Sequence, residues 1–422
     1  MRHPWWVLAG LVAGVGTGLG LRIWHPEVGP FLQAWVEPWG ELFLRLLFLL
    51  VIPVLLTALP LGIASAGSLF KLGRTALTAL ALSLVLGASS VAVALVLVNV
   101  THPGRTMVGK VPPAEEMALG ESSSPLARAV DLIPGNPFGL MAGWLGWKSA
   151  ARMMLAMLGL AVGLGFVLLL LPEGKGGGMR VGWERAFEIC MQLIGGLIRW
   201  APGAVFSLTC LSFFRTGPEL LGYLGTFVLT VLLALGLQGF GVYPLLLKFL
   251  VRYDLGKFWR GIREPLSTAF ATASSNATLP VTLRAAEGPL ELRPEISRFV
   301  LTAGASTNQN GTALYEGVTV IFLAQAAGVD LGLSQQAVVA GWALIASLGT
   351  AGVPGGTLPM IAAVLASLGV DPNQTGVGIA LILGVDRFLD MCRTSINVTG
   401  DLVIAAVTDR LSAPDDQGSA GK

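Results

Sequence analysis

The sequence predicts an all-α, polytopic membrane protein, and three observations support this fold class. The chain of 422 residues is 54% hydrophobic and only 12% charged, whereas soluble domains carry about 25% charged residues. Its 55 glycines fit closely packed membrane helices, in which small residues let backbones approach one another. A spanning helix needs about 20 mostly apolar residues, and runs of that kind lie at 5–22, 41–66, 75–100, 151–171, 185–213 and 221–250.

The positive charges of the loops predict the orientation of these helices, because cytoplasmic loops are enriched in Lys and Arg. Every second loop carries them: Arg2, Lys71, Arg74, Lys175, Arg180, Arg185, Lys248, Arg252, Lys257, Arg260 and Arg263. We therefore expect a multi-pass protein of the cell inner (plasma) membrane with both termini in the cytoplasm and residues 101–150 outside. Residues 1–412 are expected to form one membrane domain, followed by a disordered tail at 413–422. The first apolar run leads into another span, so we interpret it as a retained helix and not as a signal peptide.

Several classes of function are disfavoured by composition. The net charge is +2 and no basic stripe occurs, so nucleic acid is not an expected partner. The histidines (His3, His25, His102) and cysteines (Cys190, Cys210, Cys392) are scattered. A hydrolase or transferase would need clustered metal ligands or a positioned base. We expect no enzymatic activity and no cofactor. A passive anion channel is a further alternative, which would show currents that are not coupled to uptake of a solute.

The last third of the chain contains two apolar segments that are interrupted by polar residues, Gly and Pro. These segments, 266–283 and 343–365, are each followed by a long helix with a polar break, at 308–312 and at 397–401. Paired broken segments are typical of inverted repeats that form a binding site near the bilayer midplane. Positive charges flank the first segment, and none occurs from 299 to 386. We therefore expect two re-entrant hairpins that enter from opposite sides.

The strongest cluster of polar residues lies between 390 and 401. Asp390, Arg393, Asn397 and Asp401 are spaced by three, four and four residues, which places them on one helix face. Polar side chains in a membrane helix are costly unless they point inward toward partners. The alternative interpretation is a structural salt bridge between Asp390 and Arg393, which would leave Asn397 and Asp401 unexplained.

The sequence N-Q-N-G-T at 308–312 is expected to loosen its helix and free backbone carbonyls, which can form a site for a hard cation beside carboxylates. The alternative is a simple polar kink. The serines at 274–276 and the turn at 349–355 offer further hydroxyl and amide groups, but each is a weak signal alone.

Taken together, these motifs resemble the glutamate/aspartate transporter family, the dicarboxylate/amino acid:cation symporters. The pieces that carry the resemblance are SSNATLPVTLRAAE, NQNGTALYEGV, SLGTAGVPG and DMCRTSINVTGD, with KLGR at 71–74 and IPGNPFG at 133–139. The resemblance implies eight transmembrane helices plus two re-entrant hairpins, in a homotrimer that works by an elevator mechanism. It also implies a static scaffold at about 5–66 and 151–213 and a mobile transport domain at about 71–100 and 221–410.

The resemblance also implies roles for individual residues. Arg393 matches the arginine that holds the side-chain carboxylate of the substrate, and Asp390 matches the acid that holds its α-amino group. The other substrate positions are Ser275, Thr312, Val353, Thr394 and Asn397. One candidate sodium site comprises backbone carbonyls of Gly304, Asn308 and Asn397 with the carboxylate of Asp401. A second uses backbone oxygens of Ser306, Ser347, Leu348 and Thr350.

Three departures from the family pattern concern the coupling ions. Sodium-coupled members have N-M-D-G-T where this chain has Gln309 and Asn310. In the family, hydroxyl groups of the third helix complete a third sodium site. An ungapped alignment from KLGR places Ser83, Leu86 and Gly87 at those positions. An arginine often found in the first hairpin or the eighth helix is replaced by Ala273 and Met391. We expect the third sodium site to be missing, because a buried sodium ion needs a full negative charge and several oxygens.

Glu316, one helical turn beyond Thr312, is the candidate proton carrier. Ionisable residues inside membrane helices are functional candidates, and the position matches the glutamate thought to carry the proton in eukaryotic members of the family. The alternative is a glutamate that is permanently protonated or paired. The sequence thus predicts secondary active uptake of an acidic amino acid, coupled to protons, to fewer than three sodium ions, or to both. The alternatives are a C4-dicarboxylate symporter and a carrier of neutral amino acids.

Overall fold

The computed structural model describes residues 5–50, 52–53, 56–57, 60–61, 64, 74–108, 124–134, 137–145, 150–170, 177–349, 361, 364–365, 367–370 and 372–412. Every regular element in this part of the chain is helical, which confirms the predicted all-α class. The elements are α1 (Trp5–Trp24), η1 (Pro26–Val28), α2 (Gly29–Phe31), η2 (Leu32–Val36), α3 (Glu37–Leu49), α5 (Arg74–Thr101), η3 (Arg105–Met107), α7 (Pro125–Asp131), α8 (Pro137–Trp144), α9 (Ala150–Leu170), α10 (Gly177–Ile198), α11 (Ala201–Thr216), α12 (Glu219–Gly236), η4 (Leu237–Val242), α13 (Tyr243–Val251), α14 (Leu255–Gly261), α15 (Arg263–Thr272), α16 (Ser275–Glu287), α17 (Pro294–Thr307), α18 (Asn310–Ala326), α19 (Leu333–Gly349) and α21 (Pro372–Leu411).

Two stretches of the described chain are long and apolar enough to cross a membrane: Leu77–Thr101 in α5, and Glu219–Val251, which runs through α12, η4 and α13. A third is obtained if α10 and α11 count as one span, although they are bent by 54° relative to each other. The expectation of a single helix over 185–213 is therefore corrected. Pro202, in the first turn of α11, explains the break, because proline cannot continue the hydrogen bonds of a preceding helix.

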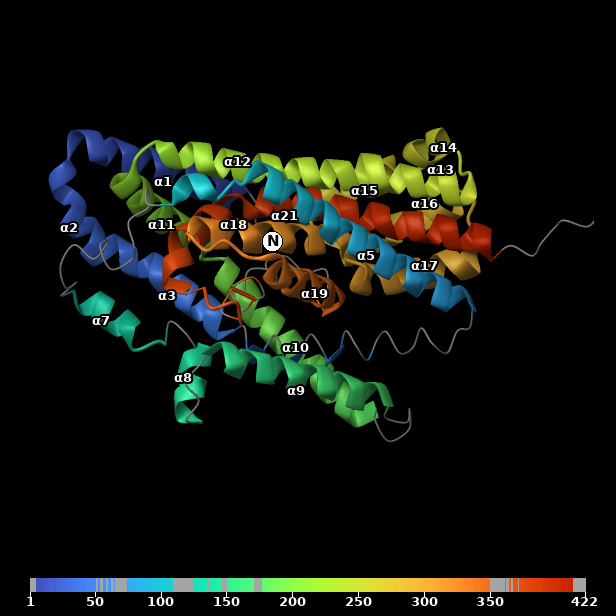
Figure 1. Ribbon diagram of the computed structural model, residues 1–422, viewed down its shortest axis with the longest axis horizontal. Helices are drawn as coiled ribbons and strands as arrows, with labels where there is room; N and C mark the ends of the chain where they lie inside the picture. Colours follow the sequence, from blue (N-terminus) through green and yellow to red (C-terminus); the bar gives the residue numbers. More distant parts are fainter. Residues whose placement is uncertain are drawn as a thin grey trace, which may run out of the picture.

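α18 is the centre of the molecule. Every residue from Asn310 to Gln325 is buried, and α18 packs against α5, α12, α19 and α21. Figure 1 shows α18 in the middle of the molecule, with the long α21 running beside it and toward the α15–α17 region. A helix that is buried on all sides has no face for water or lipid, so its polar side chains must find partners inside the protein.

The first interrupted segment forms a helical hairpin, as the sequence predicts. α15 ends at Thr272, and Ala273 adopts a left-handed conformation with φ +48°. Ser274 then caps α16, because its hydroxyl accepts a hydrogen bond from the amide of Ala277 at 3.2 Å. Both arms of the hairpin pack against α21. The second interrupted segment, 343–365, lies mostly outside the described residues. Only the end of α19, at 343–349, and positions 361 and 364–365 of this segment are described.

The two expected polar breaks have different outcomes. The break at 308–312 is confirmed, since α17 ends at Thr307 and α18 begins at Asn310. The break at 397–401 is wrong, because α21 is one helix of 40 residues. Its hydroxyls bond within the helix: Thr399 Oγ1 donates to the carbonyl of Ser395 at 2.7 Å. Its other polar groups point at neighbouring helices, so the backbone is not needed to satisfy them.

A stripe of glycines joins α1 to α11. A Cβ atom on Gly10 would overlap the carbonyl oxygen of Pro202, and one on Gly18 would overlap that of Cys210. On Gly14 it would overlap the hydroxyl of Thr209 and lie 2.8 Å from the carbonyl oxygen of Phe206. The spacing of four residues places these glycines on one face, so the two backbones can approach closely.

We predict that Gly14→Ala destabilises the protein, because the added methyl group overlaps backbone and side-chain atoms of α11, and overpacking costs about 1–3 kcal/mol. Gly16→Ala is the matched control, since a Cβ atom there meets open space. The melting temperature of the purified protein should fall for Gly14→Ala and hold or rise for Gly16→Ala. Equal melting temperatures would contradict the close approach of α1 and α11.

Candidate functional site

The candidate site is built on one polar face of α21. The side chains of this face are all buried: Asp386, Asp390, Arg393, Asn397 and Asp401. Their spacing of three or four residues keeps them in line along the helix. The sequence predicted four of them. Asp386 was missed, although it lies one helical turn before Asp390 and continues the same spacing.

Arg393 is only 2% exposed and lies in a cluster of charged and aromatic groups. Its Nε donates to Asp390 Oδ1 at 3.0 Å, and its Nη2 lies 3.5 Å from Asp386 Oδ1. The guanidinium carbon is 4.3 Å from the centre of the Tyr315 ring, and the Tyr315 hydroxyl donates to Asp386 Oδ1 at 2.8 Å. The salt bridge considered from the sequence is therefore formed, as one part of a larger cluster. Tyr315 was also missed, because nothing local to α18 shows that its ring covers Arg393.

Asn397 connects α21 to the broken helix of α17 and α18. Its Oδ1 accepts a hydrogen bond from the amide of Gly311 at 2.7 Å. Its Nδ2 donates to Gln309 Oε1 at 2.6 Å and to Thr312 Oγ1 at 3.3 Å. Asn397 and Thr312, two of the predicted substrate positions, are thus in direct contact.

Three residues that were expected to share a cation site lie together one turn of α21 beyond Asn397. They are Asp401 on α21, Gly304 in α17 and Asn308 just after α17. Asn308 Nδ2 donates to Asp401 Oδ1 at 2.7 Å. A Cβ atom on Gly304 would be 2.5 Å from Asp401 Oδ1, so only glycine leaves room for the carboxylate. Asn308 Oδ1 is buried and has no hydrogen-bond partner among the described residues. A carboxylate beside backbone and side-chain amide oxygens is the type of ligand set that hard cations prefer.

The remaining predicted substrate positions are described only in part. Ser275 is the first residue of α16, and its hydroxyl is buried without a hydrogen-bond partner among the described residues. Thr394 is buried on α21 beside Arg393. Val353 lies outside the described residues.

The second candidate sodium site is described even less completely, so this expectation stays a prediction. Thr350 lies outside the described residues. Ser306 falls in the last turn of α17, and Ser347 and Leu348 fall in the last turn of α19.

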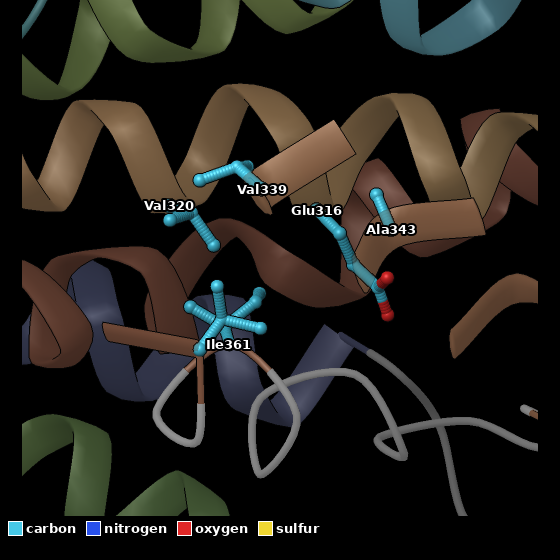
Figure 2. A pocket seen from close by; sticks show the side chains of 6 residues that line it. Glu316, Val320, Val339, Ala343 and Ile361 are labelled. Carbon is cyan, nitrogen blue, oxygen red and sulfur yellow. The ribbon is translucent and has the colours of Figure 1, made fainter. Parts of the chain in front are cut away.

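Glu316 lies in α18, directly after Tyr315, and is 4% exposed. Its Oε1 has no hydrogen-bond partner in the described part of the chain. A small cavity adjoins it, lined otherwise by apolar side chains: Val320, Val339, Ala343, Ile361 and Val364. Figure 2 shows the carboxyl group at one end of this cavity, with Val320, Val339 and Ile361 gathered at the other. A buried carboxyl group without a partner carries a large desolvation cost when it is charged.

The side chains aligned with the third sodium site, which was expected to be missing, carry no charge: Ser83, Leu86, Gly87 and Asn310. Gly87 lies beside Asn310, since a Cβ atom there would be 3.7 Å from Asn310 Oδ1, and Leu86 is fully buried. Asn310 Nδ2 lies 3.4 Å from the Tyr243 hydroxyl, which donates to the carbonyl of Ile396 at 3.1 Å. The hydroxyl of Ser83 donates within its own helix, to the carbonyl of Ala79 at 2.9 Å.

Comparison with known proteins agrees with this geometry. An all-helical chain with a buried, charged site between one continuous helix, α21, and the broken helix of α17 and α18 is the arrangement expected of a membrane transporter. The chain belongs to the sodium:dicarboxylate symporter family, whose model matches residues 4–411.

Three relatives illustrate the range of similarity. The chain is 28% identical to the proton/sodium-glutamate symport protein of Bacillus caldotenax, over 96% of this chain and 93% of that protein. It is 29% identical to excitatory amino acid transporter 3 of Mus musculus, over 98% of this chain and 86% of that protein. It is 38% identical to excitatory amino acid transporter 4 of Rattus norvegicus, over 56% of this chain and 42% of that protein.

We predict that Asp386→Asn lowers the melting temperature strongly, because removing one partner of a buried ion pair costs about 3–5 kcal/mol. Asp330→Asn is the matched control. Asp330 also pairs with an arginine, Arg105, but both side chains are more than half exposed, and such surface pairs contribute little. Thermal unfolding of the two purified variants checks the prediction. A similar shift for both would show that Asp386 does not hold Arg393.

Proposed function

We propose that this protein takes up an acidic amino acid, aspartate or glutamate, by cation-coupled symport. The observation that carries the proposal is the buried pair of Arg393 and Asp390, which offers a positive and a negative group side by side. The guanidinium of Arg393 binds the side-chain carboxylate of the substrate, since this group forms two parallel bonds to a planar carboxylate. Asp390 binds the α-ammonium group. The proposed substrate contacts also include Ser275, Thr312, Val353, Thr394 and Asn397, with Asn397 on the α-carboxylate.

The charges of the cluster argue against the two alternative substrates. A C4-dicarboxylate has no ammonium group for Asp390, and it would bring further negative charge to a site that already holds two carboxylates for one guanidinium. A neutral amino acid would bring no side-chain carboxylate for Arg393 to bind. An amino acid with an acidic side chain satisfies both groups at once.

For the coupling ions, we propose protons, fewer than three sodium ions, or both. Gly304, Asn308, Asn397 and Asp401 form the candidate site that includes a carboxylate. Asn310 gives the third-site region no negative charge, and the neighbouring Leu86 and Gly87 provide no side-chain oxygen. Glu316 is the proposed proton carrier, because its buried carboxyl group can be loaded on one side of the membrane and emptied on the other.

We further propose a homotrimer in the plasma membrane, with both termini cytoplasmic, that works as an elevator. The packing is consistent with two parts that move relative to each other. α11 packs against both α1 and α3, whereas α5, α15–α19 and α21 surround the candidate site. The resemblance assigns the first group to a scaffold and the second to a transport domain, within eight transmembrane helices and two hairpins.

Arg393→Cys tests the substrate. We predict that this variant loses uptake of aspartate and glutamate and gains uptake of small neutral amino acids, because the group that requires an acidic side chain has gone. Labelled uptake into proteoliposomes, with each ion gradient imposed separately, measures both effects. Unchanged affinity for aspartate would overturn the assignment of Arg393.

Glu316→Gln tests the proton pathway. We expect the wild type to take up substrate in sodium-free buffer when a pH gradient is imposed, and the variant to lose this response, because an amide cannot carry the proton. Glu287→Gln is the control, since Glu287 pairs with Arg298 at the surface. If the wild type ignores the gradient, or Glu316→Gln responds to it as the wild type does, Glu316 is structural.

A further inference from the structure

The broken helix of α17 and α18 is bridged by side-chain amides. A helix end leaves backbone carbonyls without partners, and a helix start leaves amide N–H groups without partners. Here the carbonyl of Ala305, near the end of α17, accepts from Gln309 Nε2 at 3.1 Å. The N–H of Gly311, at the start of α18, donates to Asn397 Oδ1 at 2.7 Å. Gln309 and Asn397 are joined by a third bond of 2.6 Å, which completes a chain of three hydrogen bonds.

The backbone fixes the direction of this chain. The N–H of Gly311 can only donate, so the oxygen of the Asn397 amide must face it. The carbonyl of Ala305 can only accept, so the nitrogen of the Gln309 amide must face that group. The oxygen of Gln309 is then left to accept from the nitrogen of Asn397. Both amides therefore have only one orientation that satisfies all three bonds.

This arrangement determines what Asn397 can offer to a ligand. One hydrogen of its Nδ2 is held by Gln309 in the short bond, and the other points to Thr312 Oγ1 at 3.3 Å. The longer bond is the weaker one, so it is the one that a substrate carboxylate can replace. The bond to Gln309 remains in place and aims the free hydrogen.

We propose that Gln309 is a positioning residue for substrate binding, which orients the amide of Asn397 and closes the break between α17 and α18. This inference rests on the proposed function, because Asn397 is taken to bind the α-carboxylate. Gln309 is 3% exposed and Asn397 is 2% exposed. An apolar side chain at 309 would leave the Ala305 carbonyl and one N–H of Asn397 unpaired in the interior, which is expensive.

The test is a double-mutant cycle on the full-length protein, with L-aspartate binding measured by calorimetry. We expect Gln309→Leu to weaken binding by about 10- to 100-fold, the effect of a buried polar group left unpaired. If Gln309 acts through Asn397, the double variant should bind within about twofold of Asn397→Ala alone, because coupled residues are not additive. Gln325→Leu is the matched control. Gln325 is also a buried glutamine, but it lies in the last turn of α18, where its Oε1 accepts from the amide of Gly104, and this variant should bind as the wild type does.

Three results would overturn the inference: wild-type affinity in Gln309→Leu, additive losses in the double variant, or an equal loss in Gln325→Leu. If the wild type binds neither aspartate nor glutamate, the proposed function fails instead. In that case, melting temperatures of the ligand-free wild type, the two single variants and the double variant still test whether the hydrogen bonds of Gln309 and Asn397 are coupled. Additive shifts for Gln309→Leu and Asn397→Ala would show that the two side chains do not act together.

Discussion

Burial of the Arg393 guanidinium is the constraint on which the rest of the structure depends. A charge away from water must be paired and hydrogen-bonded, and here the partners come from two helices: Asp386 and Asp390 on α21, and Tyr315 on α18. α18 can supply a ring at this point only because it is buried on every side and pressed against α21. The close packing of α18 against α21 is therefore also what supplies Arg393 with one of its partners.

A helix break and an unbroken helix lie side by side, and each depends on the other. The gap at Asn308 and Gln309 leaves backbone groups in the buried interior without helical partners. α21 stays continuous and presents Asn397 and Asp401 to that gap at successive turns. The continuous helix α21 thus acts as the template against which the broken one is held. The same side chains are then placed to meet a solute and a cation.

Much of the fold could be predicted from local sequence, and the failures have a common physical cause. The break at 308–309, the hairpin around Ser274 and the polar face of α21 follow from local patterns. The break expected at 397–401 was wrong, because a run of polar residues looks the same whether it unwinds a helix or faces partners across space. The contacts of Tyr315 and the bonds of Gln309 join distant segments, which no local pattern reports. Asp386 is different, because the spacing of the polar face extends to it and could have identified it.

The glycine stripe has a consequence for the biosynthesis of the protein. Residues 25–200 lie between α1 and α11, so α1 is made well before the helix that covers its glycine face. At about 5–20 residues per second, that delay is roughly 10–35 seconds. During this interval the glycine face of α1 lacks α11, the helix with which it packs in the folded protein. The newly made chain is therefore open to wrong helix pairings for a defined time, which ends when α11 arrives.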